Sequence, residues 1–347
     1  MASGDTDLRL VFWNTWLLRP RLWPGGPALP GGERFFAPDV TRRAPLVGAA
    51  LAGRFDVAAM AECFEQPEQD AVRAAWPDGA MAAAGPGRGR FRFTGSGLLT
   101  VVDPTTPARA EVVGSVRHAY RAGGDVRDSD TFATKGALLV RVRVGGTSGP
   151  VVDVVSTHLI AGGDLLPVPG ANDAARHHRA RMAQVDELVA FVNQARDPAN
   201  PLVLVGDLNV AAHDPDPSLT DPTERHRDLL ARLEPLGLVD QWVASGVGAG
   251  HTCNFDDPAQ LPPDPHEPDA VSDGPERAGD APDPLGLPGE RIDYVCLAPA
   301  RTGSTEVAAG RPRRWAFPGR DATGGPAGSL SDHLALSVTL TLSRHAE

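Results

Sequence analysis

Polar side chains with catalytic chemistry follow several apolar runs of the sequence. The run LVLVGDLN places Asp207 and Asn209 directly after alternating Leu and Val residues, which predict a buried strand reaching the rim of a sheet. Taken alone, this Asp and this Asn are explained equally well as turn residues. The pattern recurs at the ends of other segments, whose polar residues are Asn14, Glu62, His158, Asp293, Asp332 and His333. This repetition predicts an active site at the edge of an α/β sheet.

Carboxylates, imidazoles and amides gathered in one place are suited to hydrolysis assisted by a metal ion. Hard oxygen ligands beside imidazoles favour a divalent ion of the Mg²⁺ type over zinc, because the sequence has no cysteine cluster and no His-x-x-x-His pair. The side chains at the strand ends could supply such a site.

The composition limits the classes of partner. The net charge of −11 and the pI of about 5.4 argue against a broad basic surface that grips nucleic acid. The longest apolar stretches have the length of strands, far short of the ~20 residues that span a bilayer. The segment MASGDTDLRL has no basic region followed by an apolar core, so we expect a cytoplasmic protein. The three cysteines lack metal-like spacing and are expected to be free thiols.

Strands and helices alternate along the chain. Apolar runs predict strands at 8–13, 137–144, 151–156, 202–206, 292–297 and 334–342. Apolar periodicity predicts a helix at 174–195, which Asn172 and Asp173 can cap, and a second helix at 224–234. This interleaving favours one α/β domain over two independent ones.

Two segments rich in proline interrupt this alternation. Residues 19–33 are rich in Pro and Gly, and residues 256–290 are rich in Pro and acidic side chains. The second composition cannot bury enough apolar surface to order itself, so we expect a mobile surface loop there.

The ordered set of motifs resembles the endonuclease/exonuclease/phosphatase superfamily. The matching segments are WNTW, AECF, STHL, GDLN, RIDYV and SDHLAL, spread over residues 8–343. Each motif is short, but the ordered set is specific. The resemblance implies a four-layer α/β sandwich, in which two mixed sheets pack face to face between outer helices. It also implies a single catalytic domain over residues 1–347 with its metal site at one rim.

Within this superfamily the chain looks most like the bacterial neutral sphingomyelinases. Phe64 follows Glu62 by two residues, and the segment DTFATKG holds Asp130 and Lys135 with the spacing found in that family. The segment RMAQ lies on the helix after THL, where the family also has an Arg and a Gln. The segment GHTCNFDD resembles a further sphingomyelinase loop.

The sequence also departs from that family. Ala61 stands where the superfamily usually has Gln or Asn, and Asn254 and Phe255 replace a Thr-Trp pair in the GHTCNFDD loop. The aromatic hairpin by which secreted sphingomyelinases touch membranes is represented only by RRWAFPG. This segment contains Trp315 and Phe317, which either are exposed beside the site, where they would contact substrate together with Phe64, or simply cover a hydrophobic patch.

The resemblance implies a metal site built around Glu62. Asn14 and Asp332 are expected to be outer ligands of the same ion, through water where needed, because Mg²⁺ keeps several of its waters. We expect Mg²⁺ as the cofactor, with Mn²⁺ or Co²⁺ as substitutes.

Catalytic roles are assigned to the remaining strand-end residues. We expect Asp207 to activate or orient the attacking water, with Asn209 holding water or phosphate beside it. A carboxylate at Asp293 would fix the tautomer of His333 and stabilise its charged form, which can donate to the phosphate or the leaving group. His158 would be the second imidazole, stabilising the transition state, although a purely structural role competes.

Asp130 and Lys135 also have two interpretations. They can form an ordinary solvated ion pair, which contributes little to stability. In the resemblance they form a switchable element near the active site, with Asp128 as an alternative acidic partner.

The leading functional hypothesis is a Mg²⁺-dependent phosphodiesterase that cleaves a phospholipid headgroup ester, as a sphingomyelinase or phospholipase C does. The alternative keeps the site but changes the substrate to a nucleic acid or a soluble phosphate ester. A catalytically dead binding scaffold is less favoured, because such a scaffold has no need for costly charges at the rim. We expect a phosphodiester substrate, transient contact with a membrane surface and no stable protein partner.

Overall fold

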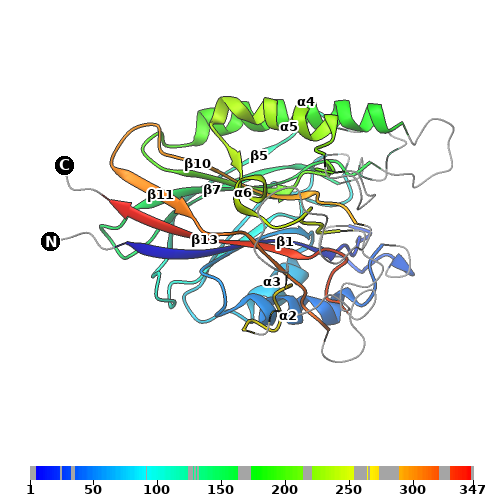
Figure 1. Ribbon diagram of the computed structural model, residues 1–347. Helices are drawn as coiled ribbons and strands as arrows, with labels where there is room; N and C mark the ends of the chain where they lie inside the picture. Colours follow the sequence, from blue (N-terminus) through cyan, green and yellow to red (C-terminus); the bar gives the residue numbers. More distant parts are fainter. Residues whose placement is uncertain are drawn as a thin grey trace.

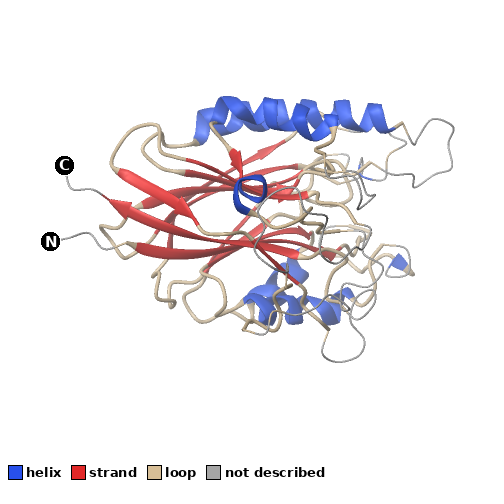
Figure 2. Cartoon of the chain, in the orientation of Figure 1, coloured by secondary structure: helices blue, strands red, loops and turns tan. Residues whose placement is uncertain are grey.

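Two mixed β-sheets lie face to face between two groups of helices (Figures 1 and 2). The computed structural model describes residues 5–23, 26–32, 36–90, 92–123, 128, 130, 133–162, 173–213, 221–253, 264, 266–272, 289–319 and 329–344. The strands of the first sheet are β1 (Thr6–Leu17), β2 (Val57–Cys63), β3 (Met81–Ala84), β4 (Leu99–Val102), β11 (Thr305–Ala309), β12 (Arg313–Trp315) and β13 (Ala335–Arg344). The strands of the second are β5 (Glu111–Ala119), β6 (Gly136–Arg143), β7 (Val151–His158), β8 (Leu202–Asp207), β9 (Val239–Asp240) and β10 (Asp293–Ala298).

The strand order differs from the order along the chain. The first sheet runs β11-β13-β1-β2-β4-β3, with β12 paired to β13, and the second runs β5-β6-β7-β8-β10-β9. The first described strand therefore pairs with the last, because β1 lies antiparallel to β13.

Helices cover the outer face of each sheet. α2 (Val40–Leu51) and α3 (Gln66–Arg73) lie over the first sheet, and α4 (Ala174–Ala195) and α5 (Glu224–Leu233) lie over the second (Figure 1). η2 (Glu234–Leu236) follows α5, and α6 (Gln241–Ser245) packs against β9 and β10. One apolar cluster fills the space between the sheets, and two others join each sheet to its helices. The four-layer sandwich expected from the sequence is confirmed.

Strand register brings the polar strand ends together. β7 and β8 are parallel with His158 opposite Asp207, and β10 is antiparallel to β8 with Asp293 opposite Asp207. In the first sheet, parallel β1 and β2 bring Asn14 beside the end of β2, which carries Glu62. These residues meet at one end of the sandwich, whereas both chain ends lie at the other (Figure 1).

Most elements expected from apolar periodicity are present. The helix at 174–195 has the predicted bounds, and the Asp173 carboxylate caps it by accepting hydrogen bonds from two backbone N–H groups of the first turn. Asn172 and most of the segment 256–290 lie outside the described residues. In the described part of the chain, no helix combines the length and the apolar character needed to cross a membrane.

A buried ion pair joins β9 to the start of β10. Arg291 Nη1 donates to Asp240 Oδ2 at 2.8 Å, and both side chains are buried. The Arg291 guanidinium lies 4.9 Å from the centre of the Tyr294 ring. Burial opposes the negative charge, but the neighbouring Arg291 and His226 hold the pKa of Asp240 at about 2. The motif RIDYV therefore contributes to stability as well as to the site.

Replacing Arg291 by Met should lower the free energy of unfolding by about 3–5 kcal/mol at neutral pH, because Asp240 would remain as a buried charge without its guanidinium partner. The pKa of Asp240 in the folded protein, about 2, is below the ~3.9 of unfolded Asp. The pair's contribution is therefore complete above the unfolded pKa and is lost as the pH falls through the folded one. Urea titrations of both proteins at neutral and acid pH measure the difference. If the difference in unfolding free energy between the two proteins does not shrink on acidification, the Arg291–Asp240 pair is not its cause.

Candidate active site

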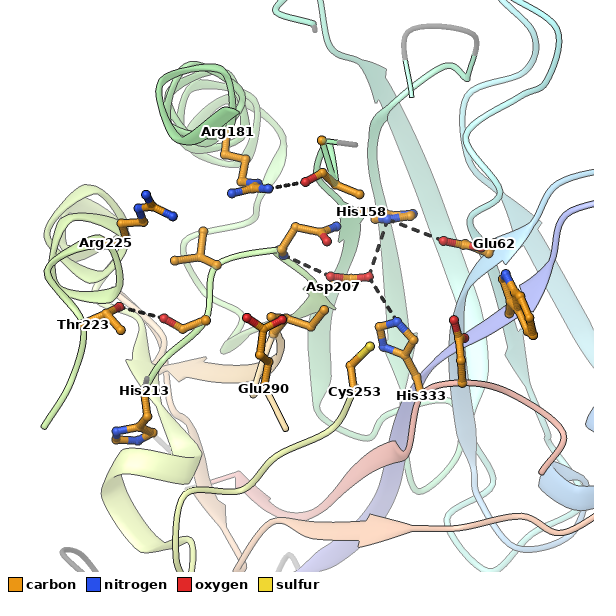
Figure 3. Close-up of a pocket in the computed structure, with 18 of the residues that line it drawn as sticks. Glu62, His158, Arg181, Asp207, His213, Thr223, Arg225, Cys253, Glu290 and His333 are labelled. Atoms are coloured by element: carbon orange, nitrogen blue, oxygen red, sulfur yellow. Dashed lines mark hydrogen bonds and ion pairs between the residues drawn. The ribbon is translucent and has the colours of Figure 1, made fainter. Parts of the chain in front are cut away.

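Asp207 lies at the centre of a group of polar side chains (Figure 3). Its Oδ2 accepts a hydrogen bond from Asn14 Nδ2 at 2.9 Å, and it lies 3.5 Å from His158 Nε2 and 3.9 Å from His333 Nε2. Its Oδ1 accepts a hydrogen bond from the backbone N–H of Asn209 at 3.0 Å. Burial is the largest of the effects that raise the pKa of Asp207 to about 7. The carboxylate can therefore exchange a proton near neutral pH, as a general base requires.

The backbone around the site has unusual conformations. Glu62 and Asn209 have positive φ angles of 58° and 52°, a region that costs a non-glycine residue roughly 1–2 kcal/mol. Such strain is frequent at functional sites. A side chain at Gly206 would clash with the carbonyl oxygen of Thr157. Glycine at this position thus lets β8 approach β7 closely just before the strand delivers Asp207.

His333 and Asp293 form the predicted pair. His333 Nδ1 lies 2.9 Å from Asp293 Oδ2, and Thr252 Oγ1 donates to the same oxygen at 2.6 Å. Burial opposes a positive charge on the ring, but the neighbouring Cys253 and Asp293 raise the pKa of His333 well above its ordinary value. His333 is therefore protonated at neutral pH and can donate from Nε2 into the cavity.

Replacing Asp293 by Asn should move the alkaline limb of kcat/KM to lower pH. The protonated form of His333 is the donor, so activity is lost as the pH rises through the pKa of this group. Removal of the Asp293 charge lowers that pKa, and the loss then begins at lower pH. A pH profile of both enzymes on one phosphodiester tests the shift. An alkaline limb at the wild-type position, in a variant of reduced activity, would mean that Asp293 only supports the fold.

His158 and Lys135 form a second cationic part of the site. Lys135 Nζ lies 3.1 Å from His158 Nε2 and 3.5 Å from Asp130 Oδ2. Burial, followed by the positive charge of Lys135, holds the pKa of His158 well below its ordinary value, so its ring is neutral. The alternative partner Asp128 instead pairs with Arg176 at 2.7 Å. The structure thus joins Lys135 to Asp130, as the sphingomyelinase resemblance implies.

Glu62 and Asp332 carry oxygen atoms that could hold a metal ion. Burial, followed by the charge of Asp332, raises the pKa of Glu62 to about 7. Two carboxylates that repel each other in a buried site are stabilised by a divalent cation. Their hard oxygen atoms are the ligands that Mg²⁺ prefers. The residues present therefore fit a divalent metal ion.

Asn14 forms hydrogen bonds with two carboxylates of the site. Its Nδ2 donates to Glu62 Oε1 at 3.2 Å as well as to Asp207, while its Oδ1 accepts a hydrogen bond from the N–H of Trp16 at 3.1 Å. In this arrangement Asn14 orients the two carboxylates. Its role as a metal ligand, and the matching role of Asp332, stay predictions.

Asp207, Asp293 and His333 also bring one possible ligand atom each within 4.8 Å of one another. Asp293 Oδ2 already accepts hydrogen bonds from His333 and Thr252. This trio is therefore better arranged for proton transfer than for holding an ion. Asn209 donates from Nδ2 to the carbonyl of Leu159 at 3.1 Å, which fixes its amide beside Asp207.

The three aromatic residues expected at the substrate lie in the interior instead. Trp315 is 8% exposed, and its indole N–H donates to a serine hydroxyl on β13. Phe317 is 2% exposed and packs against Trp13 with ring centroids 4.9 Å apart. Phe64 is 7% exposed, lies against Gly97 and does not line the cavity. The prediction that Trp315 and Phe317 are exposed membrane contacts is wrong, and Phe64 does not reach the substrate space.

Supporting residues that were not predicted fix the loops of the site. Ser331 Oγ donates to the Asn14 carbonyl at 2.7 Å and accepts a hydrogen bond from the N–H of His333 at 3.1 Å. Buried Arg43 donates to carbonyl groups on both sides of the site. Ser331 and Thr252 lie within the motifs SDHLAL and GHTC, which could have indicated them. The role of Arg43 could not be predicted from the sequence, because an arginine on a helix usually points to solvent.

A cavity of about 750 Å³ is lined by site residues that include Asp207, Asn209 and Asp332. Glu62 and His333 line one part of it, and Arg181 and Arg225 line another (Figure 3). This volume is within the range of pockets that hold a whole small molecule rather than a single ion.

Comparison with known proteins identifies the family. A family model described as the endonuclease/exonuclease/phosphatase family matches residues 11–333. The chain belongs to this family. Members of the endonuclease/exonuclease/phosphatase family are metal-dependent hydrolases of phosphate esters, and the protein is accordingly an enzyme of this class. No curated protein sequence matches the chain at a significant level.

Several solved structures share the fold. A beta toxin variant from Staphylococcus aureus with bound magnesium ions has a TM-score of 0.59 and 16% identity, covering 96% of this chain and 99% of that one. Sphingomyelinase C from Streptomyces griseocarneus has a TM-score of 0.54 and 16% identity, with the same two coverages, 96% and 99%. TDP2 from D. rerio, complexed with a single-strand DNA product, has a TM-score of 0.53 and 15% identity, covering 97% and 99%.

Proposed function

We propose that the enzyme is a Mg²⁺-dependent phosphodiesterase. One observation carries the proposal: the Asp207 carboxylate lies within 4 Å of two imidazoles, one neutral and one charged, beside the acidic pair Glu62 and Asp332. In the reaction, a water oxygen attacks phosphorus and the bond between phosphorus and the leaving oxygen breaks. The products are a phosphomonoester and an alcohol.

The side chains divide the work of this reaction. Asp207 Oδ2 takes the proton of the attacking water, and Asn14 and Asn209 hold the carboxylate in place. His333 gives the proton at Nε2 to the leaving oxygen and regains a proton from solvent, while the Asp293 carboxylate at Nδ1 stabilises the charged form of the ring.

The charge of the phosphoryl group is met by the other cationic and polar groups. His158 lies beside Asp207 and Lys135 contacts the His158 ring, so the two side chains can stabilise negative charge on the phosphoryl oxygens. A divalent ion held by Glu62 and Asp332 would polarise the phosphoryl group and neutralise its oxygens.

The finer proposal is a phospholipid headgroup ester as the substrate, cleaved in the manner of a sphingomyelinase or phospholipase C. The Asp130–Lys135 contact supports it, since this pairing is one of the sphingomyelinase features of the sequence. The fold shared with a sphingomyelinase C gives further support. A nuclease or soluble ester hydrolase is the second candidate, favoured by the similarity to a structure that holds a DNA product.

Four substrates separate these possibilities: sphingomyelin in vesicles, supercoiled plasmid, bis(para-nitrophenyl) phosphate and para-nitrophenyl phosphate. Each is incubated with Mg²⁺, Mn²⁺, Co²⁺ or excess chelator. We expect hydrolysis of the chromogenic diester with metal and none with chelator. Release of phosphocholine from vesicles would support the lipid proposal, and nicking of plasmid alone would replace it. Equal rates with metal and with chelator would refute the metal assignment.

A further inference from the structure

The cavity has a cationic end that the hydrolysis of a simple diester does not use. Arg181 comes from α4 and Arg225 from the first turn of α5, and both line the cavity at a distance from Glu62 (Figure 3). The packing of α4 against α5 brings the two side chains to the same wall. Both guanidinium groups thus lie beside the space that the group attached to the reacting phosphate would occupy.

Arg181 is held rigidly in this wall. Its side chain is 9% exposed. Its Nε donates to the carbonyl of Ile160 at 2.8 Å, and one terminal nitrogen donates to the carbonyl of Ala161. Two backbone bonds leave the remaining terminal nitrogen without a hydrogen bond to any described residue. A buried cation whose position is fixed in advance loses little entropy when it binds an anion.

Arg225 increases the positive charge of the same wall. In the described part of the chain it makes no hydrogen bond or ion pair, although it lines the cavity. Burial is the main cause that lowers the pKa of Arg181, and the positive charge of Arg225 lowers it further. Asp207, Asp130 and Glu290 act in the opposite direction, so the guanidinium keeps its charge at neutral pH. An anion between the two arginines would remove their repulsion.

The same wall is poorly suited to a quaternary ammonium group. Such cations are recognised by the faces of aromatic rings. Among the described residues that line the cavity, Trp16 is the single Trp, Tyr or Phe, and it belongs to β1 with Asn14. Glu290 and Glu224 also line the cavity and could attract a cation, but the two arginines would repel it. The guanidinium groups offer hydrogen-bond donors that no described residue uses, and these donors suit a negatively charged group.

We propose that Arg181 and Arg225 form a subsite for a second anionic group, so that the preferred substrates are phosphodiesters carrying a phosphate or carboxylate beside the reacting phosphate. This inference rests on the proposed phosphodiesterase function, which it narrows. Within the lipid proposal, it selects an anionic headgroup over one that ends in choline.

Three chromogenic diesters with the same para-nitrophenolate leaving group test the subsite. Their second ester group is phenyl, carboxyphenyl or choline, and the first two differ only in the carboxylate. We expect kcat/KM to be highest for the carboxyphenyl ester, by roughly tenfold over the phenyl ester, the scale of a charge-assisted hydrogen bond. Arg225→Gln should reduce this ratio toward one.

Arg179 provides the matched control. It lies on α4, is largely exposed and does not line the cavity. Arg179→Gln removes the same charge and should leave the ratio of the two kcat/KM values unchanged. A choline ester preferred over the carboxyphenyl ester would overturn the subsite. Equal effects of Arg225→Gln and Arg179→Gln on the ratio would also overturn it.

Calorimetry separates a failure of the subsite from a failure of the proposed function. The binding of carboxyphenyl phosphate is compared with that of phenyl phosphate, in the wild-type protein and in Arg225→Gln. Tighter binding of carboxyphenyl phosphate than of phenyl phosphate, in the wild type but not in Arg225→Gln, would support the subsite. If at the same time none of the three diesters is hydrolysed, the proposed phosphodiesterase function is refuted and the subsite is not. No preference in binding would refute the subsite, whatever the rates.

Discussion

Replacing Asp207 by Asn should lower the turnover number on bis(para-nitrophenyl) phosphate by about 100-fold or more, the usual scale for a general base. The amide has nearly the same shape and can keep a contact with Asn14, but it cannot take a proton from water. The protein should remain folded, because Asp207 ends a strand whose apolar residues form the core. Initial rates at saturating Mg²⁺, together with circular dichroism, measure both quantities.

Asp153 offers a control for this substitution. It is a buried carboxylate on β7, in the same sheet as Asp207, and it does not line the cavity. Asp153→Asn tests whether loss of a buried negative charge alone reduces turnover per folded molecule. His333→Ala should cost a similar factor to Asp207→Asn, since it removes the proton donor. Turnover near the wild-type value in either site variant would exclude its assigned role.

Glu62→Gln should remove most of the activity and most of the response to metal. The isosteric amide preserves the shape of the side chain but removes the negative charge that attracts a divalent ion. Mg²⁺ should raise the melting temperature of the wild-type protein, because a ligand that binds only the folded state stabilises it. The variant should show little of this increase, and calorimetry should show weaker Mg²⁺ binding.

Without metal, we expect the melting temperature of Glu62→Gln to be higher than that of the wild-type protein. Burial and Asp332 raise the pKa of Glu62 to about 7, above the ~4.3 of an unfolded glutamate, so its ionised form destabilises the folded state at neutral pH. Glu62→Gln should therefore melt at a higher temperature than the wild type in the presence of chelator. Glu111→Gln, at the far end of β5, is the matched control. A variant that binds Mg²⁺ as tightly as the wild type would place the metal elsewhere.

The parts of the fold that could be predicted are those with a strong local pattern. The α4 helix has a long amphipathic repeat and a capping aspartate, and β8 has an unbroken apolar run. By contrast, α2 was not predicted, because Pro45 and Gly48 lie inside it and both residues weaken a helical pattern. Its helical form depends on packing against the first sheet, which a local pattern does not contain.

The same difference explains which site residues could be found. Asp207, His333 and Glu62 could be predicted from the sequence because polar residues at the ends of apolar strands are unusual. The exposure of Trp315 was misjudged because its burial depends on partners from distant parts of the chain, such as Phe55. Arg181 and Arg225 could not be paired in advance, since only the packing of two helices brings them to one cavity.

The pairing of β1 with β13 has a consequence for the folding of the newly synthesised enzyme. Residues 6–12 form their ladder with residues 336–342, so β1 can form this pairing only after β13 has been synthesised. Contacts of such long sequence separation also slow folding. Because Asn14 extends from β1 and His333 immediately precedes β13, the catalytic centre assembles only when this last pairing closes. A chain that lacks β13 would therefore be inactive.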